Sequence, residues 1–272
     1  MSRTNPLGRE TGIPEGYSPG VLYPMSRVDH RDALGIRAAL PFTGEDVWSA
    51  FEFSWLNARG KPEVAMVRVQ VPCESPCIVE SKSMKLYLGS FSQTRVDSTT
   101  RVQGMLAADL ASAFGTEVEV GLVSLADMSA IGEGPPGLCL DELDVDIHSY
   151  DYAVETLAVL PGGEEVHRET LHSNLFRSIC PVTGQPDWAT IIVRYSGPAM
   201  DRAALLGYLI GFRRHPAFHE AVVEQIFMDL SQRCGAKELS VHGCFLRRGG
   251  IDISPFRSNF EGPPPPMRLL RQ

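Results

Sequence analysis

The chain has 272 residues, 43% of them hydrophobic, and a formal net charge of −8. This length can bury one large core or two smaller ones, and no apolar run approaches the roughly 20 residues that span a bilayer. An acidic protein is a poor direct partner for nucleic acid, because phosphates are bound by basic surfaces. Six cysteines without disulfide-framework spacing, and a start unlike a signal peptide, lead us to expect reduced thiols in the cytoplasm.

The first half of the chain alternates between strand-like and helix-like patterns. Apolar residues over 102–113 recur at i, i+3 and i+4, which predicts a helix with one buried face. Gly115 follows as its C-terminal stop. In chain order we expect a turn at 60–63, a strand at 65–69, a helix beginning at Ser81, a helix over 102–113 and a strand at 117–120.

Charged residues crowd the start of the predicted helix at Ser81. Glu80, Lys82 and Lys85 lie within about one turn of each other. The free N–H groups of the first turn and the two ammonium groups would together suit a phosphate-bearing ligand. An ordinary solvated helix start is the alternative interpretation.

The second half contains a loop that is rich in turn residues, over 179–188. Pro181, Gly184 and Pro186 fix or bend its backbone, so that Cys180 and Asp187 can face one cavity from opposite sides. A thiol nucleophile and a nearby proton donor are the minimum parts of a covalent catalyst. A buried structural cysteine beside a surface aspartate is the alternative.

The remaining predicted elements of the second half repeat those of the first. Residues 87–91 recur as 208–212, a shift of 121 positions, and Gly235 stops a second amphipathic helix as Gly115 stops the first. The repeated elements are a turn at 184–187, a strand at 190–194, a helix over 222–230 and a strand at 238–241. Strands and helices repeated in this order predict an α+β fold with antiparallel sheets backed by helices.

A third charged motif lies at 247–255, near the C-terminus. Arg247 and Arg248 precede Gly249 and Gly250. The glycines allow a close approach of the backbone to a ligand, and the guanidinium groups can bind oxyanions. A charged hairpin turn is the alternative.

The repeat is broken at the residues that carry chemistry. Cys180 aligns with Leu56 in the first half, and Lys82 aligns with Ala203 in the second. The first half therefore lacks the cysteine, and the second half lacks the lysine motif. We expect one site that uses residues of both halves, and neither half active alone.

Three other patterns have an ordinary explanation. Residues 132–137 match the glycine spacing of a dinucleotide fingerprint, but two prolines remove its strand–turn–helix context, so we interpret them as a loop. His215 and His219, and Cys73 and Cys77, have spacings that a metal could use on a helix. No second cysteine pair completes a tetrahedral set, and we expect no metal.

Together, the three motifs resemble the QueF family of nitrile reductases. These enzymes reduce 7-cyano-7-deazaguanine to 7-aminomethyl-7-deazaguanine with NADPH, in the biosynthesis of the tRNA nucleoside queuosine. Residues 80–87 match the family signature, Glu-x-Lys-x-x-Lys followed by an apolar and an aromatic residue, at every position. The resemblance covers about 17–258. Ser254 and Phe256 depart from it, because the family pattern has Asn and Trp there.

The resemblance implies two tandem tunnel-fold modules of the long family form. We expect an N-terminal tail at 1–22, a first module at 23–155 with the lysine motif and a second module at 156–272 with the cysteine loop. It also implies a cytoplasmic homodimer that acts on a small deazapurine, uses two NADPH and needs no metal.

The resemblance further implies the role of each site residue. Cys180 would attack the nitrile carbon to form a covalent thioimide, Asp187 would protonate the nitrogen, and His219 is a candidate second proton donor. The substrate-binding residues would be Val79, Glu80, Ser81, His219 and Glu220. The cofactor-binding residues would be Ser81, Lys82, Arg248 and Gly249.

Two other functions stay open at this stage. A zinc-dependent cyclohydrolase of the same fold would hold a tightly bound metal. A purine- or pterin-binding protein without activity would bind the base and leave NADPH unconsumed.

Overall fold

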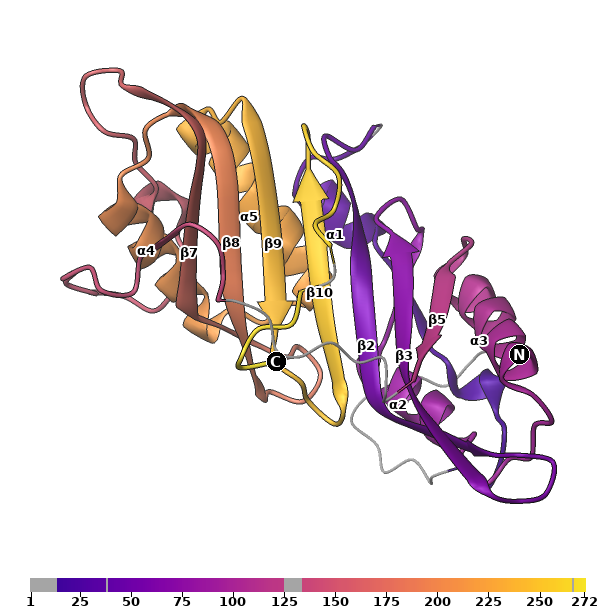
Figure 1. The fold of residues 1–272 in the computed structure, drawn as a ribbon. Coiled ribbons are helices and arrows are strands. Elements are labelled where there is room, and N and C mark those ends of the chain that lie inside the picture. The colour runs from indigo at the N-terminus through magenta and orange to yellow at the C-terminus, as the bar shows by residue number, and fades with distance from the viewer. Residues whose placement is uncertain (1–13, 38, 125–133, 266) are drawn as a thin grey trace. The chain divides into compact units, whose positions relative to one another are not determined.

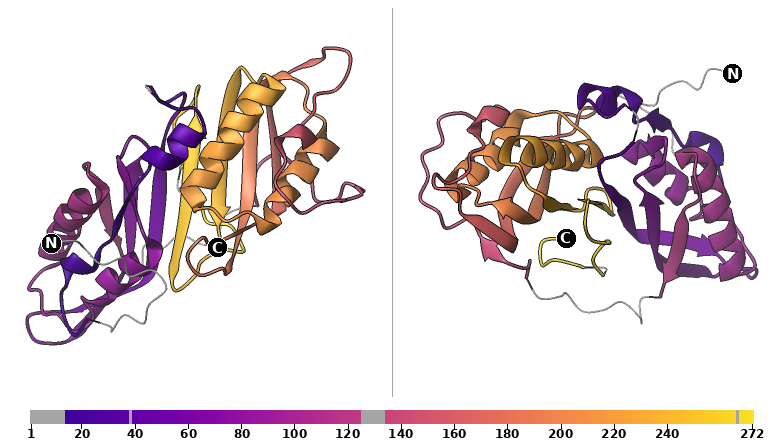
Figure 2. Two further views of the ribbon diagram at one scale, coloured as in Figure 1. Left: turned by 180° about the vertical axis from the view of Figure 1, so that it is seen from behind. Right: turned by 90° about the horizontal axis from the view of Figure 1, so that it is seen from above.

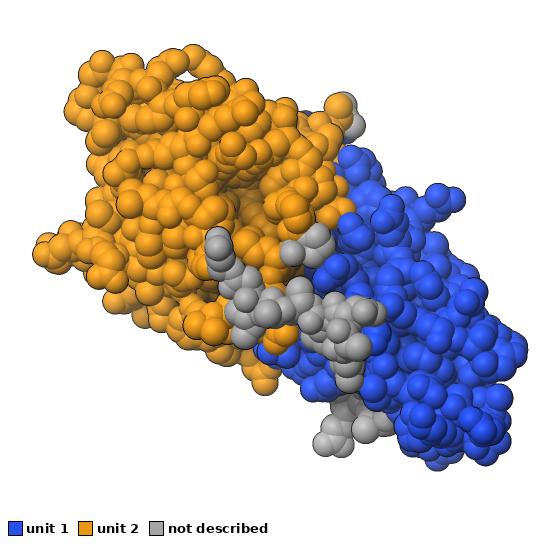
Figure 3. Space-filling model, in the orientation of Figure 1, with its two compact units in different colours: residues 1–37, 46–130, 247–252 blue, residues 38–45, 131–246, 253–272 orange. Residues whose placement is uncertain are grey.

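The computed structural model describes residues 14–37, 39–124, 134–265 and 267–272. The chain forms two compact units, which Figure 3 shows in separate colours. Unit 1 comprises residues 1–37, 46–130 and 247–252, and unit 2 comprises 38–45, 131–246 and 253–272. Each unit thus includes a short segment from a distant part of the sequence. The module boundary expected at 155/156 stays a prediction.

Unit 1 contains a sheet with the strand order β5-β3-β2. Helix α3 of the same unit lies on one side of these strands (Figures 1 and 2). Its residues Val102, Leu106 and Leu110 are fully buried. Strands β1 and β4 form a separate antiparallel pair. The elements are η1 (Pro19–Val21), β1 (Pro24–Ser26), α1 (Val28–Ala33), β2 (Thr43–Leu56), β3 (Pro62–Pro72), β4 (Cys77–Val79), α2 (Ser81–Gly89), α3 (Thr99–Phe114) and β5 (Glu119–Val123).

Unit 2 contains a sheet with the strand order β10-β9-β8-β7-β6. Its pairs are antiparallel except β6 with β7, and α4 and α5 lie on one face (Figure 2). The α+β class is confirmed. The elements are β6 (Leu138–Cys139), η2 (Val154–Thr156), β7 (Glu165–Ile179), β8 (Pro186–Pro198), α4 (Arg202–Gly211), η3 (Phe212–Arg214), α5 (His219–Cys234), β9 (Glu238–Phe245) and β10 (Ile251–Ser258).

Most of the predicted elements are present. Gly115 and Gly235 follow α3 and α5 with φ angles of 74° and 65°, the left-handed conformation that ends a helix. The strand predicted from residue 117 begins at Glu119, where pairing with Gln70 of β3 starts. Part of the loop predicted at 132–137 and most of the N-terminal tail lie outside the described residues.

The internal repeat extends to side-chain contacts. In unit 1 the hydroxyls of Tyr17 and Tyr87 donate to Asp109 Oδ2 at 2.7 and 2.6 Å. Both tyrosine rings pack on Phe91, with ring centroids 5.2 and 5.5 Å away. Two aromatic hydroxyls therefore share one carboxylate, and they tie the segment before β1 to helices α2 and α3.

Unit 2 builds the same cluster from equivalent positions. Tyr152 and Tyr208 donate to Asp229, and both rings pack on Phe212 at 5.1 and 5.3 Å. Tyr208 and Phe212 are the repeat partners of Tyr87 and Phe91. Burial raises the pKa of Asp229, while the hydrogen bonds from the tyrosines lower it. The two halves thus share the packing that positions their helices.

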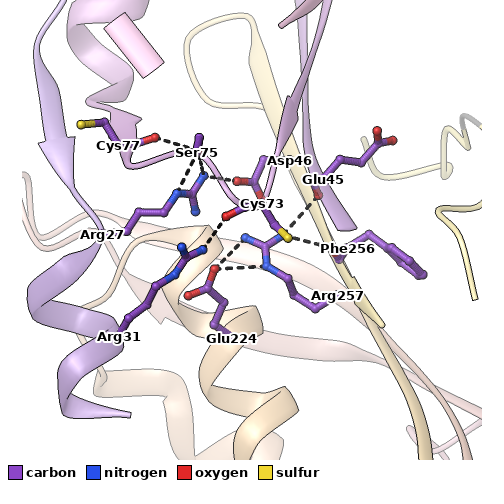
Figure 4. A network of polar contacts seen from close by, with 10 residues as sticks. All are labelled: Arg27, Arg31, Glu45, Asp46, Cys73, Ser75, Cys77, Glu224, Phe256 and Arg257. Atoms are coloured by element: carbon purple, nitrogen blue, oxygen red, sulfur yellow. Dashed lines mark hydrogen bonds and ion pairs between the residues drawn. The ribbon is translucent and has the colours of Figure 1, made fainter. Parts of the chain in front are cut away.

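Each unit also buries an ion pair that the sequence patterns did not predict (Figure 4). In unit 1, Arg27 contacts Asp46 at 2.5 Å and Ser75 at 3.0 Å. In unit 2, Glu224 of α5 accepts two hydrogen bonds from Arg257 of β10, at 2.9 and 3.1 Å. The charges are almost fully buried, so removing one partner would leave the other charge uncompensated and destabilise the fold.

Candidate active site

The Cys180 loop of unit 2 is a short connection between β7 and β8. The Cys180 N–H donates to the Gln185 carbonyl at 2.8 Å, and the Gly184 N–H donates to the Cys180 carbonyl at 3.0 Å. Gly184 has a φ of 68°, which favours glycine. The backbone on both sides of the thiol is therefore held, and the Cys180 side chain is 5% exposed.

Asp187 lies on β8 next to this loop. The register places it opposite Ser178 of β7. Opposed side chains of an antiparallel pair point to the same face, and so do residues two apart on one strand. Ser178 and Asp187 share that face, and Cys180 follows Ser178 by two residues. All three are buried.

His219 is a direct neighbour of Asp187. Its Nε2 atom lies 3.3 Å from Asp187 Oδ2. Its ring stacks on Phe245 of β9, with centroids 3.9 Å apart and planes 20° from parallel. The ring is thus held by a carboxylate at its edge and an aromatic surface at its face. This arrangement can relay a proton to or from Asp187.

Glu220 follows His219 in the first turn of α5. Its side chain is 4% exposed. The first turn of a helix stabilises a carboxylate through its unpaired N–H groups and the helix dipole. Glu220 is thus a buried carboxylate in the same helical turn as His219.

Glu80 of unit 1 caps α2, the helix with the lysine motif. Its Oε1 and Oε2 atoms accept from the N–H groups of Lys82 and Ser83 at 2.9 and 2.8 Å. Its own N–H donates to the Tyr23 carbonyl at 3.0 Å. A carboxylate has about four acceptor positions, so capping leaves it able to accept further hydrogen bonds.

Asp201 caps α4 in the same way at the repeat-equivalent position. Its Oδ1 accepts from the N–H groups of Ala203 and Ala204 at 2.9 and 3.1 Å. The acidic cap is therefore shared by the two units. The lysines at 82 and 85 are what distinguish α2.

The Arg-Arg-Gly-Gly segment lies in unit 1 beside the lysine motif. Arg248 N–H donates to the Ile251 carbonyl at 3.0 Å, and Gly249 and Gly250 have φ angles of 63° and 76°. Such a two-residue turn requires positive φ at both positions. A Cβ on Gly249 would lie 3.0 Å from Lys85 Cε, so the turn approaches that side chain closely.

Aromatic and acidic side chains of β2 flank this turn. The Arg247 guanidinium lies 4.6 Å from the centroid of the Phe51 ring, and a Cβ on Gly250 would lie 2.6 Å from Glu52 Cδ. The turn is therefore close-packed, and glycine is needed at its second position as well. Lysines of the 80–87 motif and arginines of the 247–255 motif therefore lie in the same unit.

The predicted site residues thus fall into two sets. Unit 2 brings together Cys180, Asp187, His219 and Glu220. Unit 1 contains Val79, Glu80, Ser81, Lys82, Arg248 and Gly249. The expectation that one site uses both sets stays a prediction, as do the individual roles. The contact between His219 and Asp187 was not predicted, because the two residues are 32 positions apart and no spacing rule connects them.

In the part of the chain that the structure describes, no three His, Cys, Asp or Glu side chains are grouped closely enough to hold a metal ion. Across the same residues, no helix is both long and apolar enough to cross a membrane.

Comparisons with known proteins agree with the motifs. Residues 13–122 match the family model for the N-terminal part of the nitrile reductase 7-cyano-7-deazaguanine reductase, and residues 186–263 match the model for QueF-like proteins. A protein of Chromohalobacter salexigens is 51% identical over 98% of this chain and 96% of its own length. Proteins of Bordetella pertussis and Burkholderia vietnamiensis are each 48% identical, over 100% and 98% of both chains.

All three relatives are named NADPH-dependent 7-cyano-7-deazaguanine reductase. Identity of this degree over the whole length shows common family membership. The chain belongs to the QueF family of NADPH-dependent nitrile reductases.

Proposed function

We propose that this protein reduces the nitrile of 7-cyano-7-deazaguanine to the aminomethyl group with two NADPH, through a covalent thioimide on Cys180. The observation that carries the proposal is the group of Cys180, Asp187 and His219 in unit 2. Three observations support it: the backbone hydrogen bonds of the Cys180 loop, the 3.3 Å contact between His219 and Asp187, and the names of the relatives.

Cys180 acts as the nucleophile. Its sulfur attacks as the thiolate and bonds to the nitrile carbon, and the electron pair of one C–N π bond moves to nitrogen. Asp187 gives its proton to that nitrogen, and His219 holds the Asp187 carboxyl and passes it a replacement proton. Glu220 of unit 2 and Glu80 of unit 1 are proposed acceptors for the N–H groups of the guanine-like edge, with Val79 and Ser81 as further substrate contacts.

The residues around α2 fit a phosphate-bearing cofactor. Lys82 and Lys85 lie in the first turns of α2. Gly249 approaches Lys85 closely, so the turn that carries the arginines lies beside these lysines in unit 1. Cationic side chains suit a pyrophosphate, and the Ser81 N–H is a further possible donor, whereas the N–H groups of Lys82 and Ser83 donate to the Glu80 cap. Each of two NADPH molecules would supply one hydride, the first to the thioimide carbon and the second to the carbon of the imine that remains when the Cys180 thiolate departs, and the nitrogen takes up the accompanying protons.

The experiment that tests this function is an intact mass of the protein after incubation with the nitrile and no NADPH. We expect the mass to increase by one substrate molecule, with no leaving group lost. Cys180→Ala should abolish both the adduct and turnover, because hydride transfer follows adduct formation. Cys244→Ala, at another buried cysteine of unit 2, should change neither. Appreciable nitrile reduction by Cys180→Ala would refute the thioimide.

The same proposal covers the setting of the enzyme. We propose a cytoplasmic homodimer that serves queuosine biosynthesis, acts on the free base rather than on tRNA, and needs no metal. Elemental analysis of active protein tests the last point, and stoichiometric zinc with metal-dependent activity would favour a cyclohydrolase instead. Sedimentation at several concentrations tests the dimer.

A further inference from the structure

Ser178 is a buried residue of the hairpin that carries Cys180, and its hydroxyl makes no hydrogen bond to the described part of the chain. The residue is 0% exposed, and Oγ has no partner among the residues that the structure describes. Buried hydroxyls are normally paired, because an unpaired one loses its bonds to water and gains none. Ser173 of the same strand, equally buried, donates to Asp141 Oδ1 at 2.7 Å. The hydroxyl of Ser173 therefore contributes a hydrogen bond that stabilises the fold, whereas the hydroxyl of Ser178 contributes none.

The register of β7 and β8 places Ser178 against the proposed acid. Ser178 and Asp187 are direct cross-strand partners, and such partners have Cβ atoms about 4.5–5.5 Å apart on the same face. Rotation about the Cα–Cβ bond of Ser178 can turn its hydroxyl toward the carboxyl of the facing aspartate, whose own side chain extends from its Cβ into the same space. His219 contacts Asp187 from another element, α5. The carboxyl thus lies between a histidine and a hydroxyl.

We propose that Ser178 is a positioning residue for Asp187, in the reaction proposed above, on which this inference rests. As the Cys180 sulfur bonds to the nitrile carbon, the electron pair of one C–N π bond moves to nitrogen. The proton of Asp187 goes to that nitrogen and leaves a carboxylate in a site that is 6% exposed. Ser178 donates a hydrogen bond to this carboxylate and keeps its own proton.

The timing of the hydrogen bond is what makes it useful. A hydroxyl binds a carboxylate more strongly than a neutral carboxylic acid, because the acceptor is charged. A donor that is unpaired at rest and paired as charge develops stabilises the transition state more than the ground state. The unsatisfied hydroxyl of the resting protein is then a consequence of its role.

The test compares Ser178→Ala with Ser173→Ala. For Ser178→Ala we expect thioimide formation, followed by time-resolved intact mass without NADPH, to slow roughly tenfold, the value of one hydrogen bond. The thermal midpoint should stay the same or increase, because no existing bond is lost. For Ser173→Ala we expect the reverse, a lower thermal midpoint and an unchanged rate of adduct formation.

Two further measurements separate positioning from substrate binding. Affinity for the nitrile, titrated in Cys180→Ala with and without Ser178→Ala, should be equal, because Ser178 does not touch the substrate. The solvent deuterium isotope effect on adduct formation should increase in Ser178→Ala, because proton transfer has become slower. Ser178→Thr, which keeps a hydroxyl, should restore most of the rate.

Each result decides a different point. An unchanged adduct rate in Ser178→Ala, or a loss of nitrile affinity that accounts for the slower rate, would overturn the positioning role. Failure of Ser178→Ala to fold would also overturn it, since the hydroxyl would then be structural. If the unmodified protein forms no adduct, it is the proposed function that fails.

Discussion

At the scale of single residues, the proposed chemistry depends on a buried carboxyl that contacts a histidine and faces a serine. Asp187 contacts His219 at 3.3 Å and opposes Ser178 across the hairpin. The carboxyl is 6% exposed. In such a site water cannot easily replace a missing proton donor, so a substitution that removes the acidic proton should be costly.

Asp187→Asn tests the acid directly. Asparagine keeps the shape of the side chain but cannot donate a proton in the same way, so we expect turnover to fall by roughly 10²–10⁴-fold. The measurement is NADPH oxidation at saturating nitrile. Asp201→Asn is the control, since asparagine caps a helix as well as aspartate does and α4 should be preserved. Normal turnover by Asp187→Asn would show that Asp187 is an ordinary strand residue without a role as the acid.

A second residue-scale prediction concerns His242 of β9. Burial lowers its pKa to about 4, from the usual 6.5. As the pH falls below about 6.5, the unfolded chain takes up a proton at this position and the native protein does not until about pH 4. The free energy of unfolding should therefore fall over this window, by ~1–2 kcal/mol. Urea unfolding of the protein and of His242→Gln, at pH 7 and pH 5, measures the difference. An equal loss in both would assign it to other groups.

At the scale of elements, the buried ion pair between α5 and β10 fixes the helix that begins with His219 and Glu220. Glu224 accepts both hydrogen bonds from Arg257, and neither side chain is more than 2% exposed. The pair lies about one turn along α5 from Glu220. It therefore links the position of the site residues to the sheet.

Removing one charge of this pair should destabilise the protein strongly. Glu224→Gln leaves Arg257 buried without its counter-charge, and we expect a loss of ~3–5 kcal/mol in the free energy of unfolding. Glu165→Gln is the matched control, because the ion pair of Glu165 with Lys237 is exposed and is worth less than ~1 kcal/mol. Chemical denaturation of both variants gives the two values. Equal, small losses would show that the buried guanidinium is satisfied by other groups.

The elements also show which parts of the fold could be predicted from sequence. The α3 and α5 helices were predictable, because helix periodicity and a terminal glycine are local signals. The contacts of His219 with Asp187 and of Glu224 with Arg257 were not, because they join residues 32 and 33 positions apart on different elements. The unpaired hydroxyl of Ser178 was equally invisible, since only packing distinguishes it from Ser173.

At the scale of the whole molecule, the two units divide the predicted roles between them. Unit 2 contains Cys180 and Asp187, and unit 1 contains the cationic residues proposed for the cofactor. Thiol attack should therefore respond to substitution of Cys180 or Asp187, and hydride transfer to substitution of those cationic residues.

Lys82→Ala tests this separation. It should increase the KM for NADPH or slow hydride transfer, while adduct formation at Cys180 proceeds almost normally, because thiol attack does not need the phosphates of the cofactor. Adduct formation is measured by intact mass and hydride transfer by single-turnover absorbance. Lys61→Ala, at an exposed lysine of unit 1, should leave both unchanged. A defect of Lys82→Ala in adduct formation alone would contradict the division of roles.

The composition of unit 1 has a consequence for synthesis on the ribosome. Residues 247–252 belong to unit 1, where the Gly250 carbonyl accepts from the Phe51 N–H at 3.0 Å and Arg247 lies over the Phe51 ring. This segment is translated after all the other residues of unit 1. Unit 1 therefore cannot be completed as it emerges, and its cationic turn is added last. Polypeptides cut short by premature termination before residue 247 should lack the turn altogether, so that incomplete chains would not compete for the cofactor through it.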